Sequence, residues 1–375
     1  MRIKVIELEA TADPKLVAAE LARLGQWVSP QKDHQGMICA FILDPSSSAV
    51  NPKRIESLSG VKRILGAQSP HPLVDQLAQR SLEVAGAYFG HTQAWQAQSQ
   101  PNITAPLLIA GPCSFESESI VQQVAAEVAR VGGQWLRGGA YKPRTSPYSF
   151  QGEGEKALRW ARRAADLNGL ALVTEALSET EVDLVAEYSD LIQVGTRNMQ
   201  NFSLLKRTGS TRKPVLLKRG LCSTVKEWLL AGEYLMKHGA SEVIFCERGL
   251  RHYDSSTRNL LDLGAAALLK HHYGLPVIVD PSHALGRRDL ITPLAIASVA
   301  MGVDGVMVEM HPDPGQAKSD AAQALSPREL EELSIKLGVK GSPAISRHTT
   351  EMHDVKDELE YSQSESACVE QRSLT

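Results

Sequence analysis

Short runs of apolar residues recur between residues 105 and 311, and segments with a helical pattern separate them. The runs are rich in β-branched and aliphatic side chains, which is typical of buried parallel strands. The pattern predicts eight strands: Leu107–Cys113, Trp135–Ala140, Ala171–Ala176, Leu191–Gly195, Val215–Gly220, Glu242–Gly249, Val277–Ser282 and Gly305–His311. Eight strands that alternate with helices favour an α/β fold, a (β/α)8 barrel with its parallel sheet closed on itself.

The first seventy or so residues have a different pattern, with shorter strand-like and helix-like stretches. Strands are predicted at Ile3–Leu8, Gln26–Val28, Met37–Leu43 and Val61–Leu65, and helices at Lys15–Leu24 and Pro52–Leu58. The order βαββαβ is that of a small ferredoxin-like α+β domain. The chain has 375 residues, whereas a barrel needs about 250, so one small additional domain fits the length.

The remaining segments are a linker and a tail. Pro70 and Pro72 follow a polar run and indicate a linker, and the periodicity of Leu73–Phe89 predicts a helix. From Gly341 onward the chain contains little that could be buried. The expected domains are therefore a ferredoxin-like domain at 1–72, a linker helix and connection at 73–104, the barrel at 105–338 and a disordered tail at 339–375.

Composition excludes several classes of function. The net charge is −3, from 40 basic and 43 acidic residues without a long single-sign block, so the sequence indicates neither a nucleic-acid nor a membrane partner. The segment Met1–Glu7 lacks the features of a secretion signal, and no apolar stretch is long enough to span a bilayer. Five cysteines without paired spacing do not form a disulfide framework. We expect a cytoplasmic protein with reduced thiols.

Residues able to bind a metal follow the first, seventh and eighth predicted strands. They are Cys113, His283, Glu309 and, in the loop after the last strand, Asp320. These strands are neighbours in a closed barrel, where chemistry gathers at the carboxyl ends of the strands. A thiolate, an imidazole and carboxylates suit one divalent ion such as Mn²⁺, Fe²⁺, Co²⁺ or Zn²⁺. A lone cysteine is usually a small buried hydrophobe, so the prediction depends on the joint placement.

Cationic side chains also gather at predicted strand ends. They are Arg137, Lys142, Arg144, Arg197, Lys218 and Arg248. A closed barrel would direct them into one mouth, where they repel one another unless anions bind, so a substrate with two or three negative charges is expected. Arginine suits carboxylate and phosphate. Any one of these cations could instead be solvated or paired with Glu175, Glu247 or Asp280, but six together favour an anion site.

Seven motifs in this region resemble those of 3-deoxy-D-arabino-heptulosonate 7-phosphate (DAHP) synthase, the first enzyme of the shikimate pathway. They are Ala110-Gly-Pro-Cys-Ser114, Leu136-Arg-Gly-Gly-Ala-Tyr-Lys-Pro-Arg-Thr-Ser146, Val194-Gly-Thr-Arg-Asn198, Leu217-Lys-Arg-Gly220, Cys246-Glu-Arg-Gly249, Asp280-Pro-Ser-His283 and Val308-Glu-Met-His311. They occur in order from about residue 105 to 335. The chain most resembles the beta subgroup of type I enzymes, in which an N-terminal ferredoxin-like domain binds aromatic amino acids.

The resemblance implies roles for individual residues. Cys113, His283, Glu309 and Asp320 match the metal ligands, although Asp313 could take the place of Asp320. The residues that match those holding phosphoenolpyruvate are Arg137, Lys142, Arg197, Lys218 and Arg248. Glu175 matches an acidic residue near the reacting carbon. The segment that contacts erythrose 4-phosphate is matched by Lys142, Pro143, Arg144 and Thr145.

These roles imply a metal-dependent condensation of the two substrates, in which Lys142 supplies a proton and Glu175 assists the addition of water. Similar enzymes are commonly homotetramers, and tyrosine or phenylalanine is the expected effector. The N-terminal domain could close over the barrel mouth when the effector binds, or could only stabilise an oligomer.

Two other functions are considered. 3-Deoxy-D-manno-octulosonate 8-phosphate synthase carries out the same chemistry on arabinose 5-phosphate, but that family reads KANRSS where this chain has Lys142-Pro-Arg-Thr-Ser146. A non-catalytic barrel that binds phosphorylated metabolites or aromatic amino acids is the other alternative. The presence of every candidate ligand argues against it.

Overall fold

The computed structural model describes residues 4–44, 46–47, 50, 52–66, 69–78, 82–89, 106–143 and 146–339. The predicted C-terminal tail, from residue 340 onward, lies outside this part of the chain. Among the described residues, no helix combines the length and apolar character needed to cross a membrane.

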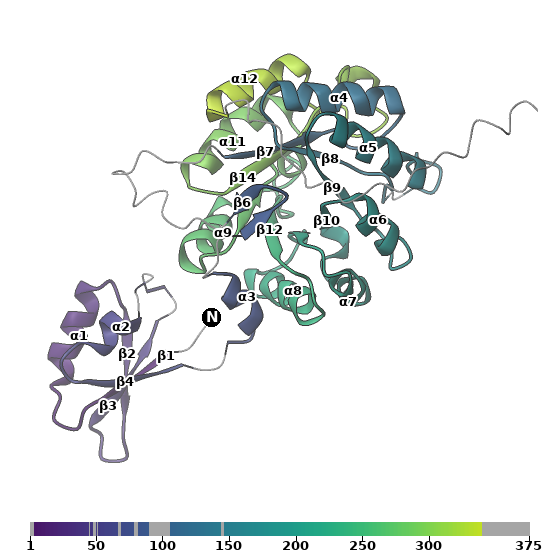
Figure 1. Ribbon diagram of the computed structural model, residues 1–375. Helices are drawn as coiled ribbons and strands as arrows, with labels where there is room; N and C mark the ends of the chain where they lie inside the picture. The colour runs from purple at the N-terminus through teal and green to yellow at the C-terminus, as the bar shows by residue number, and fades with distance from the viewer. Residues whose placement is uncertain are drawn as a thin grey trace, which may run out of the picture. The chain divides into compact units, whose positions relative to one another are not determined.

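Parallel strands close into a barrel (Figure 1). The strands are β7 (Leu107–Gly111), β8 (Trp135–Gly138), β9 (Ala171–Glu175), β10 (Leu191–Val194), β11 (Val215–Lys218), β12 (Val243–Glu247), β13 (Val277–Val279) and β14 (Gly305–Glu309). Each pairs with the next in the chain, and β14 closes the ring on β7 with Glu309 opposite Gly111. The predicted (β/α)8 fold is confirmed. The observed strands are shorter than predicted because the residues at their carboxyl ends leave the sheet.

Helices cover the outside of the barrel (Figure 1). They are α4 (Glu118–Arg130), α5 (Glu155–Leu167), α6 (Val182–Tyr188), α7 (Phe202–Ser210), α8 (Val225–Lys237), α9 (Leu263–Ala267), α10 (Pro281–Leu285), α11 (Ile291–Ala300) and α12 (Pro327–Leu337). Short turns of other helix types occur at η1 (Thr196–Asn198), η2 (Leu268–His272), η3 (Arg288–Leu290) and η4 (Pro314–Gln316). The apolar faces of the helices pack on the outward side chains of the strands, which forms most of the core.

The segment before the barrel differs from the prediction. One helix was expected over Leu73–Phe89, but α3 covers only Pro72–Leu77, and a hairpin of β5 (Leu82–Val84) and β6 (Ala87–Phe89) follows. Ala85 and Gly86 form its turn with φ of 46° and 78°. In β5 and β6 buried and exposed residues alternate, as in a half-buried strand. The helical prediction is therefore wrong, because the apolar residues follow a period of two on either side of a turn.

The hairpin fills the amino end of the barrel. Leu82 and Phe89 belong to the same buried cluster as Leu107, Trp135 and Ala171, which are the first residues of their strands. Phe89 meets Trp135 edge to face, with ring centroids 6.5 Å apart. Since apolar side chains occupy this end, the opposite end is left for polar groups.

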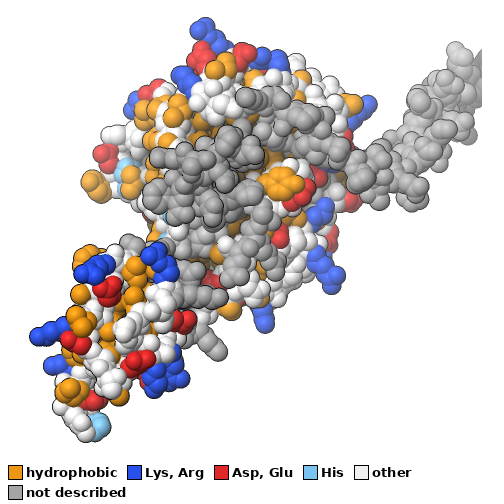
Figure 2. All heavy atoms as spheres, turned by 60° about the vertical axis from the view of Figure 1, so that its left-hand side comes forward, with side chains coloured by type: hydrophobic (Ala, Val, Ile, Leu, Met, Phe, Trp, Pro, Cys, Tyr) orange, Lys and Arg blue, Asp and Glu red, His pale blue; other side chains and the backbone are white. Residues whose placement is uncertain are grey.

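The N-terminal unit has the predicted element order. It consists of β1 (Lys4–Leu8), α1 (Pro14–Arg23), β2 (Val28–Lys32), β3 (Ile38–Leu43), α2 (Pro52–Glu56) and β4 (Val61–Gly66). The antiparallel sheet has the order β2-β3-β1-β4, and its helix-facing residues form a separate core. Strand β2 begins later and extends further than the predicted Gln26–Val28. On the face in Figure 2, Lys and Arg are mixed with Asp and Glu, and Glu7 pairs with both Lys62 and Arg63.

Candidate functional site

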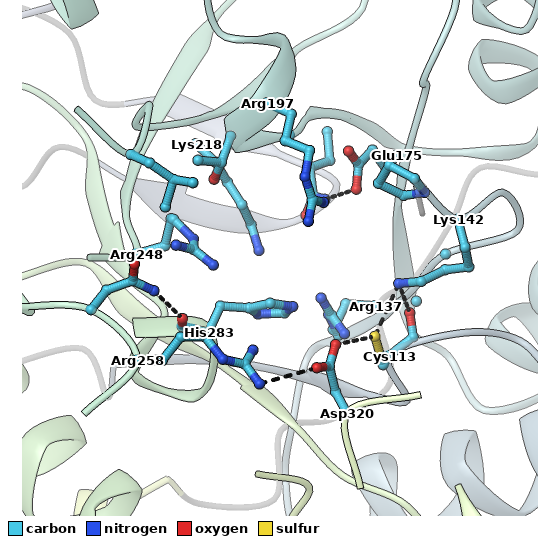
Figure 3. A pocket seen from close by; sticks show the side chains of 18 of the residues that line it. Cys113, Arg137, Lys142, Glu175, Arg197, Lys218, Arg248, Arg258, His283 and Asp320 are labelled. Atoms are coloured by element: carbon cyan, nitrogen blue, oxygen red, sulfur yellow. Dashed lines mark hydrogen bonds and ion pairs between the residues drawn. The ribbon is translucent and has the colours of Figure 1, made fainter. Parts of the chain in front are cut away.

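The candidate site is a cavity of about 440 Å³ at the carboxyl ends of the barrel strands (Figure 3). The predicted site residues that line it are Cys113, Arg137, Lys142, Pro143, Glu175, Arg197, Lys218, Arg248, His283 and Asp320. Glu309 lies just behind them, at the end of β14. Arg144 and Thr145 lie outside the described residues. Closure of the barrel thus brings together side chains that are up to 207 residues apart in the chain.

Cys113, His283, Glu309 and Asp320 form one cluster. One potential ligand atom from each lies within 4.8 Å of the others. The Nε2 atom of His283 is 3.0 Å from Oε1 of Glu309, and Sγ of Cys113 is 3.0 Å from Oδ2 of Asp320. In Figure 3, Cys113, His283 and Asp320 point toward one region of the cavity wall. The predicted meeting of these four residues is therefore found.

Asp320, and not Asp313, supplies the fourth group. The carboxylate of Asp313 accepts the backbone N–H of Gly315 at 3.1 Å and begins the short turn η4. Asp320 adopts a left-handed backbone conformation with φ of 53°, and its carboxylate faces Cys113. The alternative between the two aspartates is thus decided by the course of the loop after β14.

His283 is oriented by Asp280, which is fully buried at the end of β13. Nδ1 of His283 lies 2.8 Å from Oδ2 of Asp280, so a proton on Nδ1 leaves Nε2 facing Glu309. Burial alone would lower the pKa of His283, but the negative charges of Asp280 and Glu309 raise it to about 10. Burial would likewise raise the pKa of Glu309, yet His283 and Arg137 hold it well below its usual range.

The cluster fits a divalent cation. Two carboxylates, a thiol and an imidazole whose Nε2 faces them form a mixed donor set of the kind that transition metals accept. Nε2 of His283 lies 3.0 Å from Glu309, and a divalent ion bound by both groups would displace any proton between them. The carboxylate partner on the far side of the imidazole is typical of histidine ligands in metal sites.

Cations surround the rest of the cavity. Nζ of Lys142 lies 3.0 Å from Sγ of Cys113 and 2.8 Å from the Cys113 carbonyl oxygen. Arg137 pairs with Glu309 at 3.1 Å and is 4 % exposed, and Lys218 pairs with Asp280 at 2.6 Å. Arg137, Lys142 and Lys218 line the cavity, whereas the two acidic partners do not.

Arg248 is a buried cation whose donor atoms are not all paired with the described residues. Its NH1 atom makes no hydrogen bond with them, and burial lowers its pKa. A buried guanidinium that lacks a full set of acceptors is costly. An anionic ligand in the cavity would supply them.

Glu175 lies on the opposite wall from Asp320 (Figure 3). Its Oε2 accepts a hydrogen bond from Nε2 of Gln193 at 2.9 Å. Gly195 leaves room for this carboxylate, because a Cβ atom at residue 195 would lie 1.9 Å from Oε1 of Glu175. A glycine at this position therefore defines where the carboxylate sits.

Several site residues were not predicted from the sequence. They are Gln193, Arg251, Arg258 and Asn259, which also line the cavity, and Asp280, which was considered only as an ion-pair partner. Arg251 and Arg258 belong to the long connection between β12 and α9, whose path no periodicity predicts. Arg258 reaches Oδ1 of Asp320 at 3.3 Å. Asn259 donates to the carbonyl of His283 at 3.1 Å.

Comparison with known proteins agrees with this geometry. Residues 101–341 match the family model of the DAHP synthetase I family, which is the greater part of the chain. The chain belongs to this family. As a DAHP synthetase I family member it is an enzyme of the DAHP synthase type. The resemblance of the seven motifs is thus confirmed at the level of the family.

The relatives of this DAHP synthetase I family member differ in their sequence identity to it. Phospho-2-dehydro-3-deoxyheptonate aldolase of Thermotoga maritima is 50 % identical over 240 residues, which cover 62 % of this chain and 71 % of the relative. 2-Dehydro-3-deoxyphosphooctonate aldolase of Acidithiobacillus ferrooxidans is 29 % identical over 245 residues, covering 60 % of this chain and 86 % of the relative. The chain is thus more similar to the heptonate enzyme than to this octonate enzyme.

Solved structures give the same result. The crystal structure of the DAHP synthase of Thermotoga maritima matches with a TM-score of 0.67 and 36 % identity, over 90 % of this chain and 97 % of that one. A truncated form of the Thermotoga enzyme matches with a TM-score of 0.61 and 41 % identity, over 69 % and 90 %. Because it covers 90 % of this chain, the first match includes residues outside the barrel.

Proposed function

We propose that the chain catalyses the metal-dependent condensation of phosphoenolpyruvate with erythrose 4-phosphate to DAHP and phosphate. This is the first step of the shikimate pathway, and we place it in the cytoplasm. The observation that carries the proposal is the cluster of Cys113, His283, Glu309 and Asp320 beside a cavity lined with cations. The cofactor would be one divalent ion, namely Mn²⁺, Fe²⁺, Co²⁺ or Zn²⁺.

The cations are suited to two phosphorylated substrates. Phosphoenolpyruvate carries a carboxylate and a phosphate, and the buried groups of Arg137, Lys218 and Arg248 supply donors for both. Pro143 lines the cavity next to Lys142, and with Arg144 and Thr145 it belongs to the segment we assign to erythrose 4-phosphate. We assign Arg197 to phosphoenolpyruvate as well. Fixing both reactants in one cavity supplies the orientation that a reaction between two molecules needs.

The reaction forms one carbon–carbon bond and replaces the carbon–oxygen bond to phosphate by a bond to the oxygen of water. When bound, the metal ion would polarise the aldehyde oxygen of erythrose 4-phosphate as a Lewis acid. The methylene carbon of phosphoenolpyruvate attacks the aldehyde carbon, and water adds to the carbon that bears the phosphate. The tetrahedral product then loses inorganic phosphate and leaves the keto group of DAHP.

We assign the two proton transfers to Lys142 and Glu175. The ammonium group of Lys142 lies beside Cys113, where the aldehyde oxygen would sit, and we assign it as the donor to the developing alkoxide. Glu175 lies across the cavity and would accept a proton from the attacking water. The hydrogen bond from Gln193 fixes the carboxylate for this role.

Gly195→Ala tests the role of Glu175. The new methyl group meets only the end of the Glu175 side chain within 3.2 Å, so the carboxylate must move while the backbone can stay. Because displacement by about 1 Å can cost roughly 100-fold in rate, we expect kcat to fall by about 10- to 100-fold with little change in melting temperature. Gly264→Ala, where the nearest atom is 3.4 Å away, is the control and should keep wild-type turnover. Unchanged turnover in Gly195→Ala would remove Glu175 from the mechanism.

Phosphate release tests the proposed function. Purified protein is treated with a chelator, reloaded with Mn²⁺, and supplied with phosphoenolpyruvate and either erythrose 4-phosphate or arabinose 5-phosphate. We expect phosphate release with erythrose 4-phosphate, its loss after chelation and its return with metal. Preference for arabinose 5-phosphate would favour octulosonate phosphate synthesis, and no release with either sugar would favour a non-catalytic binding protein.

We further propose that residues 1–72 form a regulatory domain for feedback inhibition by tyrosine or phenylalanine in a homo-oligomer, with a tetramer as the expected form. Residues 73–104 would connect it to a catalytic barrel at 105–338. The separate core of the N-terminal unit supports this proposal, because a domain with its own core can fold independently of the barrel. Deletion of residues 1–72 should keep turnover and abolish inhibition by either amino acid. Inhibition that persists would contradict the proposal.

A further inference from the structure

Two buried polar side chains near the metal cluster have no part in the proposed reaction. Glu116 lies in the loop after β7, three residues beyond Cys113, and is 5 % exposed. His311 lies two residues beyond Glu309 and is 3 % exposed. Nε2 of His311 is 3.9 Å from Oε2 of Glu116. A buried carboxylate is costly unless it is hydrogen-bonded, so the partners of Glu116 indicate what it does.

Glu116 reaches the loop that carries Asp320. Its Oε1 accepts the backbone N–H of Lys318 at 2.8 Å. Next to this bond, the buried hydroxyls of Ser114 and Ser319 lie 2.9 Å apart. Ser114 follows Cys113 directly and Ser319 precedes Asp320 directly. The neighbour of Cys113 in one loop therefore contacts the neighbour of Asp320 in the other loop.

The backbone of Asp320 needs such support. Its φ of 53° lies in the left-handed region, which residues other than glycine adopt uncommonly, although aspartate does so more often than most. On the other side of Asp320, its carbonyl accepts the N–H of Gln323 at 3.2 Å. His311 holds the start of the same loop, since its Nδ1 lies 2.6 Å from the Asp313 carbonyl oxygen and 3.1 Å from the Asp313 backbone nitrogen. The loop is thus fixed on both sides of the ligand.

We propose that Glu116 is a positioning residue for the metal site. By holding the N–H of Lys318, it fixes Asp320 as the fourth ligand and so determines how tightly the divalent ion binds. Glu116 is not a member of the ligand cluster itself. The inference rests on the proposed function, because it assumes that the cluster binds a metal ion.

Titration with Co²⁺ in the absence of substrates tests this inference on the full-length protein. Binding is followed through the absorption band that Co²⁺ forms with the Cys113 thiolate. Glu116→Ala is expected to weaken Co²⁺ binding by about 10- to 100-fold, the range seen when an outer partner of a metal ligand is lost. Glu116→Gln keeps an oxygen that can accept from Lys318 and should restore most of the affinity.

A double-mutant cycle distinguishes positioning from a general loss of structure. If Glu116 acts through Asp320, Glu116→Ala will cause no further loss of Co²⁺ affinity in a protein that already carries Asp320→Ala. Glu233→Ala is the matched control, because Glu233 also holds backbone N–H groups, those of Leu73 and Val74, but lies outside the cavity lining. It should leave Co²⁺ affinity unchanged.

The outcomes separate this inference from the proposed function. Wild-type affinity in Glu116→Ala, or an equal loss with and without Asp320, would overturn the positioning role. If Glu116→Ala does not fold, Ser319→Ala takes its place in the same cycle. We then expect a smaller loss of Co²⁺ affinity, which should again be absent in a protein that carries Asp320→Ala. Failure of the wild-type protein to bind Co²⁺ at Cys113 would instead contradict the metal dependence of the proposed function.

Discussion

Replacement of His283 by alanine is expected to lower turnover by about 10³-fold. Nε2 of His283 faces Glu309 at 3.0 Å, so the variant removes one of four donors from the cluster. Lewis-acid stabilisation by a bound ion is worth several kcal/mol, and each 1.36 kcal/mol of barrier is about tenfold in rate. The measurement is phosphate release at saturating substrates with a defined Mn²⁺ concentration.

His238→Ala is the control for this variant. Nδ1 of His238 contacts the Tyr234 carbonyl on the exposed side of α8, outside the cavity lining, so turnover should remain that of the wild type. A His283→Ala protein that is folded and retains more than about a tenth of wild-type turnover would show that the imidazole is not needed. A tenth corresponds to only about 1.4 kcal/mol.

Asp280→Asn is expected to have the second largest effect, a loss of about 100-fold in metal affinity with a parallel loss of turnover. One carboxylate oxygen of Asp280 serves both Nδ1 of His283 at 2.8 Å and Nζ of Lys218 at 2.6 Å. An asparagine amide nitrogen at that position would face the two donors, His283 Nδ1 and Lys218 Nζ. The imidazole would then no longer be held with its Nε2 available to a metal ion. Loss of an outer partner typically costs 10- to 100-fold in metal affinity, which we place at about 100-fold here. As a further cost, Lys218 loses the carboxylate with which it pairs in the described part of the chain.

The chain contains a matched control for Asp280. The side chain of Asp304 is 5 % exposed and pairs with a lysine, Lys270, at 2.6 Å, but Asp304 precedes β14 at the amino end of the barrel. Both Asp280→Asn and Asp304→Asn should lower the melting temperature, because each disrupts a buried ion pair. Only Asp280→Asn should weaken Co²⁺ binding. Equal Co²⁺ affinity in the two variants would show that Asp280 serves stability alone.

The barrel and most of the site could be predicted from the sequence, because the apolar runs mark the strands and most candidate site residues follow the ends of those strands. Each apolar run marks a strand, and in a closed barrel the residues just beyond the strands must converge. Cys113, His283 and Glu309 follow this rule directly. The chemistry of the cavity could therefore be predicted from the sequence.

Long-range contacts explain what could not be predicted. The hairpin at Leu82–Phe89 forms because the amino end of the barrel presents an apolar surface around Trp135, and no local signal indicates that surface. Arg251 and Arg258 lie within a long connection, and their place in the cavity depends on its path. Asp320 and Asp313 have the same chemistry, so only the contacts of their loop with Glu116 and Ser114 distinguish them.

A crystal of the protein grown with Mn²⁺, measured for anomalous scattering, tests the central claim most directly. We expect one strong anomalous peak within bonding distance of Cys113, His283, Glu309 and Asp320, at roughly 2.0–2.3 Å from nitrogen and oxygen atoms. A crystal saturated with Mn²⁺ that shows no peak there, or a peak held by other residues, would contradict it.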